Sequence, residues 1–272
     1  MKVIIFGSNG MLGNYVKSYF TNKKYEIVGL TRKDYDLINT HIDSLDIFLN
    51  KLNLIENDII INCAGIIPQS SAYRDLDKQM YYKINGIFPI ILSALCDKYK
   101  LKMIHITTDC VFSGKIGNYS ETSLHDEIND YGVSKSLGEL CKATIIRTSI
   151  IGEEINNKRS LLEWVKSNIG KEINGFNNHY WNGVTCLELS KIIEKIIINN
   201  LFWNGVRHFF SPTIVSKYEL VRIINDIYEL NIKINKYETD IIDKSLKTNY
   251  SIDDYYIPEL SLQIKELKNY KL

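Results

Sequence analysis

The sequence lacks several features that mark specialised classes of protein. Its 272 residues carry a net charge of only +1, so no polybasic surface favours nucleic acid or an anionic membrane. No apolar run is long enough to cross a bilayer, because even residues 189–201 contain Lys191, Glu194 and Lys195. Only four prolines occur, and no proline- or serine-rich linker divides the chain. We therefore expect neither nucleic acid nor a membrane as a partner.

Cysteine and histidine form no pattern that suggests a disulfide framework or a metal site. The five cysteines are dispersed without a CxxC pair, and the five histidines form neither HxH nor HxxxH. An odd and scattered set of cysteines is typical of a reduced, cytoplasmic protein, and we expect no bound metal. Residues 1–6 lead directly into a glycine turn, so we also expect no signal peptide.

What the sequence does contain is a regular alternation of strand and helix patterns. Its hydrophobic content of 45% is ample for a large core. Apolar runs rich in β-branched residues predict buried parallel strands at residues 2–6, 25–30, 58–62, 101–107 and 143–148. Helical spacing of apolar residues predicts helices between them, at 11–20, 42–52, 75–99 and 129–143. This alternation predicts an α/β fold with a Rossmann-type, doubly wound parallel sheet.

After about residue 150 the pattern changes. Helices are predicted at 160–168, 187–199 and 216–230, short strands at 172–176 and 206–210, and no regular structure beyond these. Ser216 and Glu219 form a predicted capping box. We expect residues 1–150 to form a dinucleotide-binding domain, with a returning segment near 176–210. Residues 151–272 should form mainly a smaller α/β substrate-binding region.

The turn Gly7-x-x-Gly10-x-x-Gly13 lies between the first predicted strand and the first predicted helix. In this context Gly7 makes a tight turn, Gly10 lets the backbone approach a pyrophosphate, and Gly13 lets helix and strand pack closely. The N-terminus of the helix then faces the phosphates with its free N–H groups. An ordinary glycine turn is the alternative, and the flanking strand and helix favour the dinucleotide.

The end of the second predicted strand indicates which dinucleotide binds. An acidic residue there favours NAD, whereas an arginine accommodates the 2′-phosphate of NADP. Thr31, Arg32 and Lys33 follow the strand, and no acid occurs before Asp34. We predict a preference for NADPH with Arg32 at the 2′-phosphate, while NADH stays a second option. The alternative for these residues is a solvated basic turn.

Tyr131 and Lys135 are four residues apart on a predicted helix and therefore share one face. A nearby ammonium is expected to lower the pKa of the phenol, so that it exchanges a proton with a carbonyl or alcohol oxygen. Thr108 ends a preceding strand and would hold that oxygen by a hydrogen bond. Thr107 is the rival, because successive strand residues point to opposite faces. Asp109 is either a turn residue or a contact to substrate.

Small residues follow another buried strand, in the segment Asn62-Cys63-Ala64-Gly65. They let a cofactor lie across the carboxyl ends of the strands, where ligands of such sheets bind. Asn85, on a helix facing this region, is either a structural hydrogen bonder or part of a proton relay. We favour the structural role.

These motifs together resemble the extended short-chain dehydrogenase/reductase superfamily. Within it, the chain is similar to the family of dTDP-4-dehydrorhamnose reductases and related nucleotide-sugar 4-ketoreductases. The resemblance runs through most of the chain and is carried by the glycine turn and by residues 62–65, 105–114, 119–121, 131–139 and 146–149. Its most specific part is Thr-Asp-x-Val-Phe-x-Gly, where Cys110 stands in place of the acidic residue found in the related dehydratases.

The resemblance implies NADPH-dependent reduction of a 4-keto-6-deoxy sugar on a nucleoside diphosphate, in deoxysugar or surface polysaccharide synthesis. Tyr131 would protonate the alkoxide, Lys135 would hold the nicotinamide ribose, and Thr108 would orient the ketone. The implied cofactor contacts are Gly7, Asn9, Gly10, Met11, Leu12, Gly13, Thr31, Arg32, Cys63, Ala64, Gly65, Tyr131 and Lys135. The implied substrate contacts are Thr108, Asp109, Cys110, Trp181 and Asn182.

Two other functions remain open from the sequence. A bifunctional epimerase-reductase would need a further acid/base pair, for which Cys110 and His179 are the candidates. A non-catalytic NADP-binding regulatory subunit is the second alternative. Such proteins often lose the Tyr/Lys pair, so the presence of Tyr131 and Lys135 argues against it. A homodimer is one option for the assembly.

Overall fold

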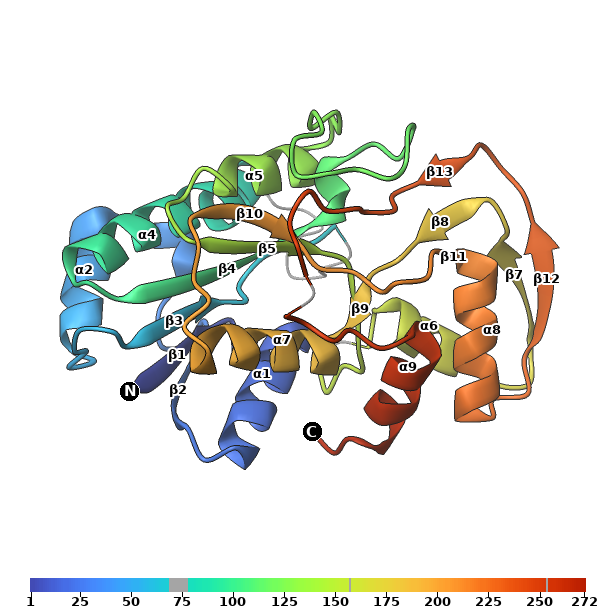
Figure 1. Cartoon of the computed structure of the whole chain (residues 1–272), viewed down its shortest axis with the longest axis horizontal. Coiled ribbons are helices and arrows are strands. Elements are labelled where there is room, and N and C mark those ends of the chain that lie inside the picture. Colours follow the sequence, from blue (N-terminus) through green and yellow to red (C-terminus); the bar gives the residue numbers. More distant parts are fainter. Residues whose placement is uncertain (69–77, 157, 253) are drawn as a thin grey trace.

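The computed structural model describes residues 1–68, 78–156, 158–252 and 254–272 (Figure 1). Its centre is a six-stranded sheet in the order β10-β5-β4-β3-β1-β2, and every neighbouring pair is parallel. The strands are β1 (Lys2–Phe6), β2 (Glu26–Leu30), β3 (Ile59–Asn62), β4 (Lys102–Thr108), β5 (Thr144–Thr148) and β10 (Gly205–His208). The predicted Rossmann-type fold is confirmed.

Helices cover both faces of this sheet, because the strands are apolar on both sides. Val3 and Ile5 of β1 pack in one hydrophobic cluster with α1 (Met11–Asn22) and α7 (Cys186–Ile198). Ile4 and Phe6 point the other way, into a second cluster with α2 (Ile42–Asn50) and α4 (Phe88–Lys98). Figure 1 shows α1 and α7 on one side of the sheet and α2, α4 and α5 (Asp130–Gly138) on the other.

The chain after β5 forms small sheets and helices beside the large sheet. β7 (Glu172–Phe176) pairs with β12 (Lys233–Tyr237), and β8 (His179–Trp181) lies between β11 (Val215–Ser216) and β13 (Ile242–Asp243). β6 (Ile150–Ile151) pairs with β9 (Val184–Thr185), and the remaining helices are α6 (Leu161–Lys166), α8 (Lys217–Tyr228) and α9 (Leu260–Asn269). β10 then returns to the large sheet and pairs with β5.

Several element boundaries differ from the predictions. The expectation of no regular structure after residue 230 is wrong, because β12, β13 and α9 form there, and Leu260, Ile264 and Leu267 bury one face of α9. The predicted helix at 75–99 is divided: residues 75–77 lie outside the described ranges, and a π-helical turn over Tyr82–Ile87 separates α3 (Gln79–Tyr81) from α4. The predicted capping box of Ser216 and Glu219 is confirmed at α8.

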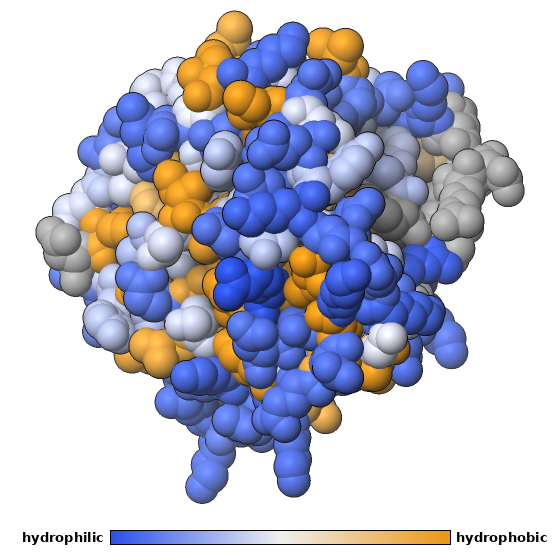
Figure 2. Space-filling view, turned by 90° about the vertical axis from the view of Figure 1, so that its right-hand side faces the viewer, coloured by the Kyte–Doolittle hydropathy of each residue, from blue (hydrophilic) through white to orange (hydrophobic). Residues whose placement is uncertain are grey.

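Figure 2 views the molecule from the end that carries α8 and β12. Hydrophilic residues dominate there, and the apolar ones form small, separate patches. The described residues on this view therefore present no broad apolar face. In the part of the chain that the structure describes, no helix combines the length and hydropathy needed to span a membrane.

Candidate active site

The glycine turn has the geometry that a dinucleotide requires. Gly7 has a φ of +75°, and a Cβ there would lie 2.7 Å from the Cα of Ala64, so the turns after β1 and β3 touch. A Cβ on Gly13 would collide with the backbone of Gly7. Gly10 precedes α1, and no described side chain caps that helix end. Its first N–H groups and positive dipole end can therefore receive phosphate oxygens.

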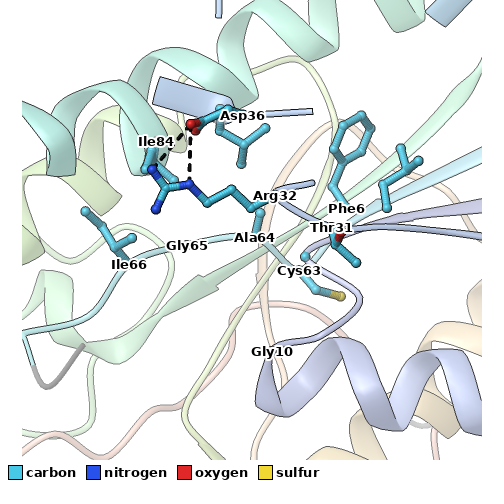
Figure 3. Close-up of a pocket in the computed structure, with 13 residues that line it drawn as sticks. Phe6, Gly10, Thr31, Arg32, Asp36, Cys63, Ala64, Gly65, Ile66 and Ile84 are labelled. Atoms are coloured by element: carbon cyan, nitrogen blue, oxygen red, sulfur yellow. Dashed lines mark hydrogen bonds and ion pairs between the residues drawn. The ribbon is translucent and has the colours of Figure 1, made fainter. Parts of the chain in front are cut away.

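A pocket opens beside this turn, at the carboxyl ends of β1, β2 and β3 (Figure 3). It brings together seven of the predicted cofactor contacts: Gly7, Gly10, Thr31, Arg32, Cys63, Ala64 and Gly65. Leu37, Ile66 and Ile84 add apolar walls. Six predicted contacts do not line it: Asn9, Met11, Leu12, Gly13, Tyr131 and Lys135. Leu12 is buried in the core, so only its backbone can serve a ligand.

Arg32 lies in this pocket and is held there by a carboxylate that the sequence reasoning did not single out. Its guanidinium forms an ion pair with Asp36 at 3.3 Å, and both residues line the pocket (Figure 3). Asp34 instead accepts hydrogen bonds from the side chain and the backbone N–H of Thr31, which hold the pKa of Asp34 below its ordinary value. The nearest acid to Arg32 in sequence is thus already bound to the turn.

α5 carries Tyr131 and Lys135 on the face that looks toward β4 and the turn after β3. The Asn129 side chain begins this helix by accepting a hydrogen bond from the N–H of Gly132 at 2.8 Å. A Cβ on Gly65 would lie 2.9 Å from Nζ of Lys135, so the ammonium occupies the edge of the cofactor pocket. Burial lowers the pKa of Lys135 to about 8, and the charge of Glu139 partly opposes this effect.

The pKa of Tyr131 is raised, not lowered as expected from the sequence. Burial is the largest cause, the neighbouring Cys110 adds to it, and a hydrogen bond with Thr108 works in the opposite direction. Lys135 is not among the groups that act most strongly on this phenol. The phenol is therefore held in its protonated form, which is the form that a general acid needs.

The two threonines at the end of β4 contact different groups. Thr107 is buried and donates to Glu139 at 2.9 Å, so it belongs to the structural side of the strand. Thr108 faces Tyr131 and also donates to Asp109 at 3.0 Å. Asp109 is only 3% exposed and accepts from the thiol of Cys110. Thr108 thus lies beside Tyr131, where its predicted catalytic role would require it, and Asp109 accepts hydrogen bonds within the turn.

The contacts of Asn85 support the structural role that we favoured. Its side chain accepts from the N–H of Ile66 at 2.9 Å, and donates to the carbonyl of Ile66 at 3.0 Å and to the hydroxyl of Ser134 at 3.2 Å. It lies in the π-helical turn, an irregularity that often occurs at functional sites. Asn85 thereby ties the segment after Gly65 to the helix that carries Lys135.

The predicted substrate contacts on β8 and beyond are largely buried. Asn182 uses its amide to bind the backbone N–H and carbonyl of Leu246, at 2.9 and 2.8 Å. Trp181 is 4% exposed and packs in the core. Cys110 and His179, the candidate epimerase pair, have no hydrogen bond or charge interaction with each other in the described part of the chain. His179 instead bonds Thr239 and stacks on Phe176.

A buried charge network behind the site was not predicted. Arg147, 1% exposed on β5, donates to Glu139, which directly follows α5, at 3.0 Å and to the ring nitrogens of His208 and His125 at 2.8 and 2.7 Å. Burial lowers the pKa of His208 to about 4, so its ring stays neutral and accepts. The sequence clue was an arginine inside an apolar strand, where an unpaired charge is costly.

The fold and this arrangement define an NADP-dependent oxidoreductase of the short-chain dehydrogenase type. A family model described as the RmlD substrate binding domain matches residues 1–241, and the chain belongs to this family.

Relatives and solved structures agree with this assignment. The chain is 27% identical over 237 residues to the dTDP-4-dehydrorhamnose reductase of Aggregatibacter actinomycetemcomitans, over 83% of this chain and 78% of that protein. Its fold resembles a dTDP-4-dehydrorhamnose reductase from Clostridium acetobutylicum, with a TM-score of 0.82, 22% identity and 99% coverage of both chains. A reductase from Bacillus anthracis, solved in complex with NADP, gives 0.81 and 23% with 98% coverage of both.

Proposed function

We propose that this chain uses NADPH to reduce the 4-keto group of a 4-keto-6-deoxy sugar carried on a nucleoside diphosphate, as a dTDP-4-dehydrorhamnose reductase does. The observation that carries the proposal is the protonated phenol of Tyr131 beside the hydroxyl of Thr108, with Lys135 at the edge of the dinucleotide pocket. The glycine turn and the uncapped end of α1 fit the pyrophosphate of the cofactor. The reduced sugar would enter deoxysugar and surface polysaccharide synthesis.

Each residue of the site then has a chemical task. When bound, NADPH supplies the hydride that reduces the ketone carbon. Thr108 donates a hydrogen bond to the ketone oxygen and holds it against Tyr131. As negative charge develops on this oxygen, the oxygen accepts the phenolic proton of Tyr131. Lys135 stabilises the resulting phenolate. The carbonyl becomes a hydroxyl, with one hydride and one proton added.

In the proposed domain arrangement, the second region binds the substrate. Residues 1–150 with the returning segment would bind the dinucleotide, and residues 151–272 would bind mainly the nucleotide sugar. A cytoplasmic location and a homodimer stay predictions from the sequence.

Turnover with defined sugars tests the proposal. The purified protein is incubated with NADPH and with dTDP-, UDP- or GDP-linked 4-keto-6-deoxy sugars, with and without a 3,5-epimerase, and NADPH absorbance is followed. We expect oxidation of NADPH with one sugar nucleotide. A need for the epimerase would show that epimerisation occurs elsewhere. Tight binding of NADPH without turnover on any sugar would instead favour a regulatory subunit.

Arg32 should determine the preference between the two nicotinamide cofactors. Replacing Arg32 by Gln removes the charge that faces the 2′-phosphate, so kcat/KM for NADPH should fall about 10- to 100-fold, the range expected for one charge-assisted contact. The value for NADH should change little. Steady-state kinetics with both cofactors measure the ratio, and Lys33→Gln, which removes the neighbouring charge, is the matched control. Equal losses for NADPH and NADH would contradict this role.

A further inference from the structure

Two lysines from the second region lie beside the active site, and neither was singled out from the sequence. Lys217 is the first residue of α8, and Lys244 follows β13 directly. Ser216 caps α8 by accepting from the N–H of Glu219 at 3.1 Å, while Glu219 accepts from the N–H of Ser216 at 2.7 Å. This capping box fixes the first turn of α8 and with it the position of Lys217.

Lys217 extends over the ring of Trp181, with Nζ 5.1 Å from the ring centroid. From there its charge acts on Asp109 and Cys110, the two residues that follow the catalytic strand end. The side chain of Lys217 therefore extends from the second region toward the turn beside Thr108.

Lys244 reaches the same turn from another direction. Its ammonium is 3.6 Å from the carboxylate of Glu127. A Cβ on Gly132 would collide with both Glu127 and the carbonyl of Cys110, so Glu127 packs against the first turn of α5. Lys244 thus stands next to the helix that carries Tyr131, and its charge acts on Cys110 and on Lys217.

Among the residues that the structure describes, Lys217 has no direct counter-ion, whereas Lys244 is paired with Glu127. In the described ranges no carboxylate lies within ion-pair distance of its ammonium, and no hydrogen bond to it is formed. Asp109 attracts it from farther away, whereas Lys244 repels it and burial lowers its pKa. The contact of its ammonium with the ring of Trp181 offsets the cost of burying this charge only in part. An ammonium without a direct counter-ion, with a second ammonium nearby, is suited to an anionic ligand.

We propose that Lys217 and Lys244 bind the diphosphate of the nucleotide-sugar substrate, with Lys217 as the principal contact. The inference rests on the proposed function and adds the part of the site that holds the anionic group. A diphosphate between these lysines lies beside the turn of Asp109 and Cys110. The sugar attached to it would then lie near Thr108 and Tyr131, which adjoin the same turn.

Binding of nucleoside diphosphates without the sugar tests this inference. Calorimetry measures the Kd of dTDP, UDP and GDP for the wild-type protein and for Lys217→Met, Lys217→Arg and Lys236→Met. For the diphosphate that binds best, Lys217→Met should weaken binding about 10- to 100-fold, and Lys217→Arg should retain most of it. Lys236 also lies over an aromatic ring, that of Tyr218, but on exposed β12, so Lys236→Met should bind like the wild type.

The same titrations separate this inference from the proposed function. The Kd of NADPH and of the unphosphorylated nucleoside should be equal in Lys217→Met and the wild type, and the thermal midpoint verifies that the variant is folded. Equal diphosphate binding by Lys217→Met and the wild type, or no diphosphate binding by the wild type, would overturn the inference while leaving any observed turnover intact. Loss of diphosphate binding in Lys217→Met, in a protein that reduces none of the sugars, would uphold the inference and refute the reductase.

Discussion

Tyr131→Phe should lower kcat for ketone reduction about 100- to 10,000-fold, the usual contribution of a positioned general acid. The substitution removes one oxygen atom and keeps the ring that packs edge-to-face with Tyr81 at 6.3 Å. The alkoxide would then have to take its proton from water. Because the phenol acts on the ketone and not on the adenine half of the cofactor, the Kd of NADPH should stay within about twofold, on the scale of RT ln 2. Single-turnover oxidation of NADPH measures the loss.

Tyr82→Phe is the control for this experiment. It removes a phenolic hydroxyl on a residue three positions before Asn85. This hydroxyl donates its hydrogen bond to Asp130, at 3.1 Å. Its kcat should equal that of the wild type. A Tyr131→Phe enzyme with a normal kcat would show that another group supplies the proton, and the assignment of Tyr131 as general acid would be abandoned.

Glu139→Gln should lower the free energy of unfolding by about 3–5 kcal/mol, the cost of leaving one partner of a buried ion pair uncompensated. Arg147 is 1% exposed and cannot release its proton at neutral pH, so the guanidinium cannot escape the penalty by becoming neutral. Burial lowers the pKa of His125 and His208, so their rings stay neutral: they can still accept hydrogen bonds but cannot replace the lost carboxylate charge. Urea denaturation at pH 7, monitored by far-UV circular dichroism, measures the change.

The ion pair between Lys98 and Asp46 provides the comparison. Its ammonium and carboxylate are 2.7 Å apart, but the lysine side chain is 55% exposed. Asp46→Asn should leave the urea midpoint nearly unchanged, because water and salt already screen an exposed pair. Similar effects of Asp46→Asn and Glu139→Gln would mean that the network around Arg147 is not a major source of stability.

The part of the site that could be predicted lies where local sequence determines geometry. The turn from Gly7 to Gly13 is short, and a Cβ on Gly13 would collide with the backbone of Gly7 within the same turn. Tyr131 and Lys135 share a helix face for the same local reason. These residues therefore lie where they were predicted to lie, as does Thr108 at the end of β4.

What could not be predicted depends on contacts between distant segments. The raised pKa of Tyr131 results from burial by several elements, which a spacing of four residues does not reveal. Arg147 meets His208 across 61 residues, and Asn182 meets Leu246 across 64. α9 was missed although Leu260, Ile264 and Leu267 have helical spacing, and packing on α8 stabilises such a short amphipathic helix more than propensity does.

The order of the strands has a consequence for how the protein is made. β10, the edge strand beside β5, consists of residues 205–208, so the nascent chain cannot complete the large sheet until the intervening 56 residues, 149–204, have been synthesised. Until then β5 is an unpaired edge strand, and its apolar edge is exposed as the chain leaves the ribosome. Folding intermediates with this edge exposed are the ones that chaperones would need to protect. A chain that stops soon after β5 should aggregate instead of forming a stable half.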